Sequence, residues 1–246
     1  MRYFYINPKN IKEKKVFFDC EKTHHIRNVL RLKINDSILL FDGIGNYYEA
    51  KISCINKKSI IGIIIAIRRL QSSKLKIKLF IALPKGNRLK WLVEKCAELG
   101  VSKIIPIKTN RSTKINFSEN FFKKYMNISI AASAQCRRLD IMELEKPMDF
   151  ISACQNAYYK SFKKKSISIL SWECEKKLNI NNILSNCILP MEANVFIGPE
   201  GGFSSKEIDI AKSFNIYTVT ISNNILRVET AAIVSVALVI NHFKGL

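Results

Sequence analysis

The sequence feature with the most specific chemistry is a glycine-rich loop at residues 197–204, Ile-Gly-Pro-Glu-Gly-Gly-Phe-Ser, between a predicted strand and a predicted helix. Ser204 and Glu207 have the spacing of a capping box, so backbone N–H groups near the helix start are available to a ligand. Glycines also let the backbone approach a ligand closely. The loop matches neither a P-loop nor a dinucleotide fingerprint, so it does not indicate a phosphate-bearing cofactor. An ordinary strand-to-helix turn is the alternative interpretation.

A second candidate site is the segment 225–232, Ile-Leu-Arg-Val-Glu-Thr-Ala-Ala, where a short loop runs into an almost wholly apolar helix. Arg227 and Glu229 would open a buried helix, and buried charges are costly unless they are paired. The two charges therefore indicate either a functional cluster or a surface ion pair. The helix from Ala231 to Ile240 is apolar on nearly all sides, so we expect it in a domain core or a subunit interface.

A third, weaker candidate is the end of a long predicted helix, where Gln135, Arg137 and Arg138 offer hydrogen-bond donors, although a solvated basic helix end would look the same. The chain has 40 Lys and Arg against 20 Asp and Glu, a net charge of +20. Such a surface attracts nucleic acid by releasing condensed counterions. A lysine-rich composition is an alternative source of part of this excess. The arginines are therefore the better candidates for RNA contacts, because guanidinium groups match phosphates and base edges.

Metal, disulfide and membrane chemistry are not indicated. The 7 cysteines include no C-x-x-C pair and are expected to be buried small hydrophobes, and the 3 histidines leave little for a metal site. No apolar stretch approaches the roughly 20 residues of a bilayer span. The N-terminus lacks the apolar core and cleavage site of a signal peptide. We therefore expect a cytoplasmic protein without a bound metal.

The elements that position the candidate residues fall into two groups. Residues 1–70 contain mostly short strands, such as Asp36–Gly43 with its Asp-Gly turn, and one helix at Thr23–Leu30 that Thr23 is expected to cap. This pattern predicts a small β-barrel. After a polar stretch at 69–74 the pattern is typical of a parallel α/β domain. The predicted strands there are 75–83, 104–107, 168–172, 195–197 and 217–221, and the predicted helices are 88–99, which ends at Gly100, 119–138, 205–214 and 228–242.

Further motifs accompany these candidate sites. They are Leu83-Pro84-Lys85-Gly86, Lys95-x-x-Glu98-Leu99-Gly100-Val101, Gln135-x-x-Arg138, His25-x-x-x-Val29-Leu30-Arg31 and Phe41-Asp42-Gly43. Together with the Gly-Pro-Glu-Gly-Gly loop and Ile-Leu-Arg-x-Glu-Thr-Ala, they extend over nearly the whole chain. In this combination the sequence resembles the RsmE family, the small-subunit ribosomal RNA uracil-N3 methyltransferases of the SPOUT superfamily.

The resemblance implies an N-terminal PUA-like RNA-binding β-barrel at 1–70 and a C-terminal SPOUT α/β domain with a deep trefoil knot at 74–246. It further implies a homodimer that uses S-adenosylmethionine to methylate one uridine of 16S ribosomal RNA in the small ribosomal subunit. The residues expected to bind the cofactor are Leu170, Gly198, Pro199, Glu200, Gly201, Gly202, Ile221, Asn224, Ile225, Leu226 and Arg227. Those expected to hold RNA are Arg2, Arg27, Arg31 and Arg138.

N3 of uridine carries a weakly acidic proton, so methyl transfer requires that the proton be removed or the resulting charge be stabilised. We hypothesise that Arg227 or Arg138 stabilises the uracil anion, and that Glu229 or Glu200 accepts the proton. The alternatives are a SPOUT enzyme that modifies a ribose 2′-hydroxyl or guanine N1, and a non-catalytic RNA-binding or ribosome-assembly protein of the same fold.

The chain departs from the family pattern at three places. Ser222, Asn223 and Asn224 follow Ile221 where relatives usually have Leu-Gly, Ala134 replaces an acidic residue, and Met142 replaces a proline. The first of these departures affects the expected cofactor contacts at 222–224.

Overall fold

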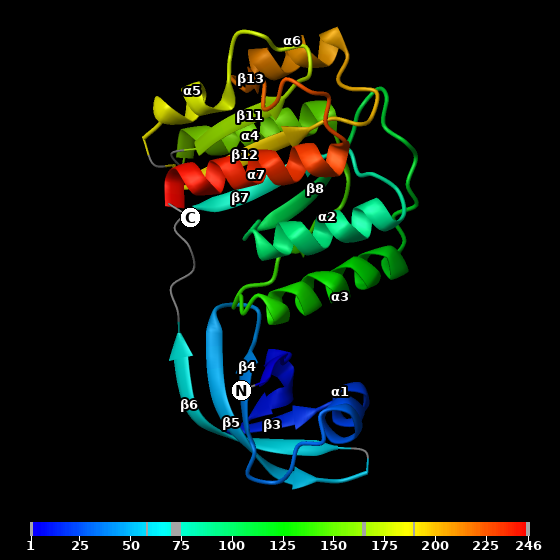
Figure 1. Ribbon diagram of the computed structural model, residues 1–246, viewed down its shortest axis with the longest axis vertical. Coiled ribbons are helices and arrows are strands. Elements are labelled where there is room, and N and C mark those ends of the chain that lie inside the picture. The colour runs from blue at the N-terminus through cyan, green and yellow to red at the C-terminus, as the bar shows by residue number, and fades with distance from the viewer. Residues whose placement is uncertain (1, 58, 70–74, 164–165, 189, 245–246) are drawn as a thin grey trace. The chain divides into compact units, whose positions relative to one another are not determined.

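The computed structural model of the chain describes residues 2–57, 59–69, 75–163, 166–188 and 190–244 (Figure 1). The chain forms two compact units, one of residues 1–72 and 133–141 and the other of residues 73–132 and 142–246. This division differs from the expected one at 133–141, which groups with the N-terminal residues. The polar stretch in which we expected the boundary lies mostly outside the described residues, since 70–74 are not among them.

The first unit is built on a mixed six-stranded sheet with the order β1-β4-β5-β6-β3-β2. Strand β1 is parallel to β4, and the other pairs are antiparallel. Alternate residues of these strands, among them Val16, Ile38, Leu40 and Ile52, are fully buried in one core. The elements are β1 (Arg2–Tyr5), η1 (Pro8–Asn10), β2 (Ile11–Lys12), β3 (Lys15–Phe18), α1 (Cys20–His24), η2 (His25–Val29), β4 (Ser37–Phe41), β5 (Asn46–Ile55) and β6 (Ile60–Arg69).

The short helix of the first unit begins earlier than the sequence indicated. Asp19 caps α1, because its side chain accepts a hydrogen bond from the Lys22 amide over 2.8 Å. The expected cap, Thr23, is buried inside the helix, and its hydroxyl donates to the Phe18 carbonyl oxygen over 3.4 Å. The prediction of a Thr23 cap is therefore wrong, although a helical segment does follow β3.

A turn at Asp42 and Gly43 joins β4 to β5 and contacts the segment 133–141. The buried Asp42 carboxylate accepts hydrogen bonds from the Ile44 amide and, over 3.0 Å, from the Tyr48 hydroxyl. Burial and this hydrogen bond raise the pKa of Tyr48 to about 12. Gly43 has φ +80° and its carbonyl oxygen accepts from the Ile141 amide over 3.2 Å. A Cβ at Gly43 would lie 2.5 Å from Ile141 Cδ1, so this close approach requires glycine.

The second unit is built on a parallel sheet with the order β10-β8-β7-β12-β11-β13, and β9 also pairs with β8. Every pairing in this sheet is parallel. The central strand β12 is buried along its whole length, as expected for a strand covered on both faces. The strands are β7 (Lys76–Ile81), β8 (Lys103–Lys108), β9 (Glu143–Leu144), β10 (Met148–Asp149), β11 (Ser166–Ser171), β12 (Glu192–Ile197) and β13 (Tyr217–Val219).

Helices cover both faces of this sheet (Figure 1). One core, around Leu79, Val195 and Ile169, includes buried residues of α2, α3, α5 and α7, and the other, around Phe80 and Phe196, includes residues of α4 and α6. No helix in the described ranges is long and apolar enough to cross a membrane. The helices are α2 (Asn87–Glu98), α3 (Glu119–Gln135), α4 (Phe150–Lys163), α5 (Ile180–Ser185), α6 (Ser205–Ser213) and α7 (Val228–Lys244).

A buried polar row crosses the central strands of the second unit. Lys78 and Glu192 form an ion pair with side chains only 8% and 5% exposed. Asn194 faces Lys78 on one side and Ser168 on the other, and its amide donates to the Ser168 hydroxyl over 3.1 Å. These residues alternate with the apolar core positions, so they share the sheet face that α4 and α6 cover.

The cysteines are free and differ in their environments. Cys96 and Cys154 are buried as expected, and burial raises the pKa of each thiol to about 12. Cys20, Cys136 and Cys174 are exposed, so the prediction that all the cysteines are buried is wrong for these three.

Candidate active site

A cavity of about 370 Å³ lies where the strands β11, β12 and β13 end and α7 begins. In an open parallel sheet, ligands bind in the crevice outside the carboxyl ends of the strands. The cavity is lined by residues of three loops and of the first turn of α7, namely Ser171, Trp172, Glu173, Ile197–Phe203, Thr220–Ser222, Asn224–Val228 and Ala231.

The structure brings together the two segments that the sequence singled out, although they are separate along the chain. All the expected cofactor-binding residues from Gly198 to Gly202 and from Ile221 to Arg227 line this one cavity. Leu170 does not, because its side chain is fully buried in the core under α4 and α6. The residues that follow it, Ser171, Trp172 and Glu173, line the cavity instead. Sequence reasoning placed this contribution too early in the strand.

The glycine loop has a fixed shape. Ser204 caps α6, and Ser204 and Glu207 form the capping box that their spacing predicted. Within the loop, the Gly202 amide donates to the Pro199 carbonyl oxygen over 2.9 Å. Gly202 has φ +68°, and a Cβ there would lie 2.1 Å from Glu173 Oε1. The loop therefore requires glycine at this position both for its backbone conformation and for space.

Gly202→Val tests this requirement. A β-branched residue at φ +68° is strained by about 1–2 kcal/mol, so we expect the loop to change shape and cofactor affinity to fall at least about tenfold. Isothermal titration with S-adenosylmethionine measures the change. Gly100→Val is the matched control, because Gly100 has φ +87° with open space around its Cβ position and lies outside the cavity. Equal loss of affinity in both variants would contradict the prediction.

Two arginines brace the glycine loop from outside. Arg88, in the first turn of α2, has its Nη1 3.1 Å from Glu200 Oε1. Arg111, in the segment after β8, donates from Nη1 to the Gly201 carbonyl oxygen over 2.6 Å. Its aliphatic stem packs on the same glycine, since a Cβ at Gly201 would lie 3.2 Å from Arg111 Cδ. The sequence gave no local sign that these arginines belong to the site.

The second cavity loop is shaped by one of the residues that depart from the family pattern. The Ser222 hydroxyl accepts a hydrogen bond from the Asn224 amide over 3.0 Å, and the Thr220 hydroxyl donates to the Ser222 carbonyl oxygen over 3.2 Å. A serine hydroxyl that binds the backbone two residues later stabilises a tight turn. Ser222 therefore provides local order in this loop without the glycine of the usual pattern.

The charged candidates of the site have different surroundings. Arg227 is exposed on the cavity wall, and its side chain has no hydrogen-bond or ion-pair partner in the described part of the chain. Glu200 also lines the cavity and is paired with Arg88. Glu229 is only 6% exposed, does not line the cavity, and its Oε2 has no hydrogen-bond partner among the described residues. The Arg227–Glu229 surface pair that the sequence left open is absent from the described contacts.

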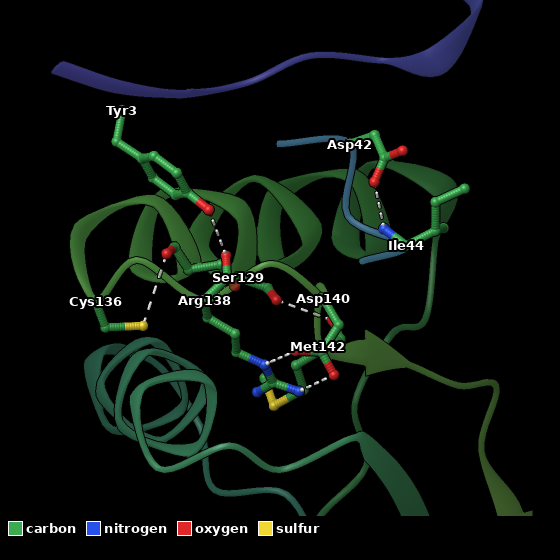
Figure 2. Close-up of polar contacts among 9 residues, drawn as sticks. Tyr3, Asp42, Ile44, Ser129, Cys136, Arg138, Asp140 and Met142 are labelled. Atoms are coloured by element: carbon green, nitrogen blue, oxygen red, sulfur yellow. Dashed lines mark hydrogen bonds and ion pairs between the residues drawn. The ribbon is translucent and has the colours of Figure 1, made fainter. Parts of the chain in front are cut away.

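The remaining candidates belong to the first unit. Arg138 is held by Asp140 in a bidentate pair, with Nε 2.8 Å from Oδ1 and Nη2 3.2 Å from Oδ2 (Figure 2). Arg27 donates to Asn28 Oδ1 and to the Lys57 carbonyl oxygen, and Arg31 is exposed with φ +51°. Arg2 lies in β1, and its side chain is outside the described part of the chain.

The other two departures have structural surroundings. Met142 is 1% exposed in the core of the second unit, and its carbonyl oxygen accepts a hydrogen bond from the Ser129 hydroxyl over 2.8 Å (Figure 2). Ala134 is half-buried in the last turn of α3. Neither residue lines the cavity.

Comparisons with known proteins agree with this architecture. Residues 71–240 match the family described as an RNA methyltransferase domain, and residues 19–65 match the RNA methyltransferase PUA domain. The ribosomal RNA small subunit methyltransferase E of Rickettsia conorii is 28% identical over 243 residues, which cover 96% of this chain and 95% of that protein. The protein of the same name from Buchnera aphidicola, subspecies Acyrthosiphon pisum, is 30% identical, with 89% and 85% covered.

A solved structure shows the same fold over the whole chain. It is that of a ribosomal RNA small subunit methyltransferase E from Neisseria gonorrhoeae bound to S-adenosyl methionine, with 25% identity and a TM-score of 0.83. The likeness covers 98% of this chain and 97% of that one. Together with the matched RNA methyltransferase domain, these relatives show that the chain belongs to the RsmE family of small-subunit ribosomal RNA methyltransferases.

Proposed function

We propose that this protein transfers the methyl group of S-adenosylmethionine to N3 of a uridine in 16S ribosomal RNA. The observation that carries the proposal is the convergence of the glycine loop and the 221–228 loop on one cavity at the carboxyl ends of parallel strands. The relative from Neisseria gonorrhoeae, which has the same fold, is bound to this cofactor. Family membership supports the RNA substrate.

The cavity has the chemistry that this cofactor requires. Ile221, Leu226 and Ala231 offer apolar surface to an adenine ring, and the backbone groups of the two loops can bind its polar edges. Gly198 and Gly202 leave room for a ligand to lie against the main chain, because a Cβ at Gly198 would already contact the Phe203 ring at 3.0 Å. When bound, the cofactor supplies an activated methyl group on a sulfonium.

The residues of the chain then act on the uracil. Arg227 is the guanidinium on the cavity wall, and we assign it the stabilisation of negative charge that develops on the base. Glu200 and Glu229 are the two candidates for accepting the N3 proton, Glu200 from the cavity lining and Glu229 from the start of α7. Arg138 keeps its proposed part in RNA binding, within the limit set by its pair with Asp140.

The same proposal includes the finer features that the resemblance implies. They are a trefoil knot in the second unit, a homodimer, RNA contacts through Arg2, Arg27 and Arg31, and action on the small ribosomal subunit in the cytoplasm. The adjacency of β12 to β7 and β11, together with the packing of α7 against β7 and β12, supports the knot.

Mass spectrometry of 16S ribosomal RNA after incubation with the protein and isotope-labelled cofactor tests the proposal. Labelled 3-methyluridine at one position is the expected product, and it stops primer extension because N3 is needed for base pairing. A labelled ribose 2′-hydroxyl or guanine N1 would instead identify a different RNA methyltransferase. A non-catalytic RNA-binding protein would give no labelled product and no calorimetric signal with the cofactor.

Glu200→Gln and Glu229→Gln separate the two proton acceptors. We expect the variant that removes the base to lower the single-turnover rate by about 10²-fold and to abolish the rise of rate with pH. The other variant should keep the pH profile of the parent protein. If both variants keep the parent rate and profile, neither carboxylate is the base.

A further inference from the structure

The arginines that brace the glycine loop have a capacity for hydrogen bonding that the loop does not use. A guanidinium carries five N–H donors in a planar fork. Arg88 contacts Glu200 and Arg111 contacts Gly201, each through Nη1, and neither side chain has another partner within the described ranges. Arg88 is 44% exposed and Arg111 is exposed as well. Their remaining donors are therefore open to solvent.

The position of both arginines follows from the topology of the second unit. Arg88 opens the helix that follows β7, and Arg111 follows β8, so both lie at the edge of the sheet where the parallel strands end. The cavity opens at the same edge, and Arg227 is on its wall. Glu200 partly neutralises Arg88, whereas Arg111 contacts a neutral carbonyl oxygen and keeps its whole charge.

We propose that Arg88 and Arg111 bind the phosphate groups of the RNA strand that flank the target nucleotide. This inference rests on the proposed function, because it requires an RNA strand at the cavity. A cavity of about 370 Å³ that holds the cofactor leaves the sugar–phosphate backbone of that strand outside, over the rim. Guanidinium groups match phosphate oxygens bidentately, and two groups already held at Nη1 lose less conformational freedom when they bind.

The salt dependence of RNA binding tests the inference. We would measure the dissociation constant for a 16S ribosomal RNA fragment at several salt concentrations, for the full chain and for Arg88→Gln, Arg111→Gln and the double variant. Each lost phosphate contact to a single strand lowers the slope of log K against log salt by about 0.7. We therefore expect a loss of about 0.7 for each single variant and about twice that for the double variant, with weaker binding in each case.

Three controls make this slope specific. Arg111→Lys keeps the charge and should keep the slope. Lys103→Gln removes a charge from the other end of β8, where Lys103 pairs with Glu143 and Glu145, and should also leave the slope unchanged. Cofactor affinity without RNA reports on the loop, because a purely bracing role for the arginines would change that affinity and leave the salt slope as it is.

The outcomes also separate this inference from the proposed function. If the parent protein methylates 16S ribosomal RNA and the glutamine variants keep its salt slope, the phosphate contacts are wrong and the proposed function stands. If the parent protein neither binds nor methylates this RNA, the proposed function fails first, and the phosphate contacts fail with it.

Discussion

Replacement of Arg227 by alanine is expected to lower the rate of RNA methylation by about 100-fold, the typical cost of removing one preorganised charge stabiliser. The reason is its position, because Arg227 is the arginine that lines the cavity and its guanidinium is not tied to a carboxylate in the described structure. Deprotonation of uracil N3 creates negative charge that such a group stabilises. Single-turnover kinetics with saturating RNA and cofactor measure the effect on the chemical step.

Binding measurements show whether the loss is catalytic. Trp172 lines the cavity, so its fluorescence reports on cofactor binding, and RNA affinity is measured separately. Arg227→Lys is the matched variant, which keeps the charge without the planar fork, and we expect it to recover part of the rate. A parent-like rate in Arg227→Ala with normal RNA binding would show that another group stabilises the uracil charge.

The second large effect is on stability, and it arises at the buried ion pair of the parallel sheet. Glu192→Ala is expected to lower the free energy of unfolding of the second unit by about 3–5 kcal/mol, because it leaves the Lys78 ammonium without its carboxylate in a buried site. Urea unfolding followed by tryptophan fluorescence measures this unit alone, since both tryptophans, Trp91 and Trp172, belong to it.

Two further variants identify the cause. The double variant Lys78→Met with Glu192→Leu removes both charges and fills the space, so we expect it to be close to the parent protein or more stable. Glu98→Ala breaks the partly exposed pair with Lys95 on α2 and should shift the transition much less. If Glu192→Ala shifts the transition no more than Glu98→Ala, the buried pair does not have the stabilising role assigned to it.

The elements that the sequence predicted well are those with strong local signals. The helix before Gly100, the capping box at Ser204 and the long apolar α7 each depend on residues a few positions apart. The helices α4 and α5 were not predicted. Buried positions of α4 include the small residues Ala153, Cys154 and Ala157, and α5 has only 6 residues. Their formation depends on tertiary packing more than on local preference.

Strand order and side-chain reach were beyond the sequence alone for a different physical reason. The position of β12 between β7 and β11 results from pairing between residues far apart in the chain, which no local pattern encodes. The same applies to Arg88 and Arg111, whose contacts with Glu200 and Gly201 exist only after the strands have assembled. The cavity loops were found because their glycines and charges lie within two short segments.

The division of the chain into two units has a consequence for any attempt to separate or exchange them. Residues 133–141 belong with the N-terminal sheet, where Tyr3 donates a hydrogen bond to the Arg138 carbonyl oxygen and Gly43 receives one from Ile141 (Figure 2). A protein truncated after residue 72 would lose these contacts. A fragment that starts at residue 73 would carry a segment without its sheet. A chimaera that exchanges the β-rich unit between relatives must therefore transfer two separate stretches of the gene.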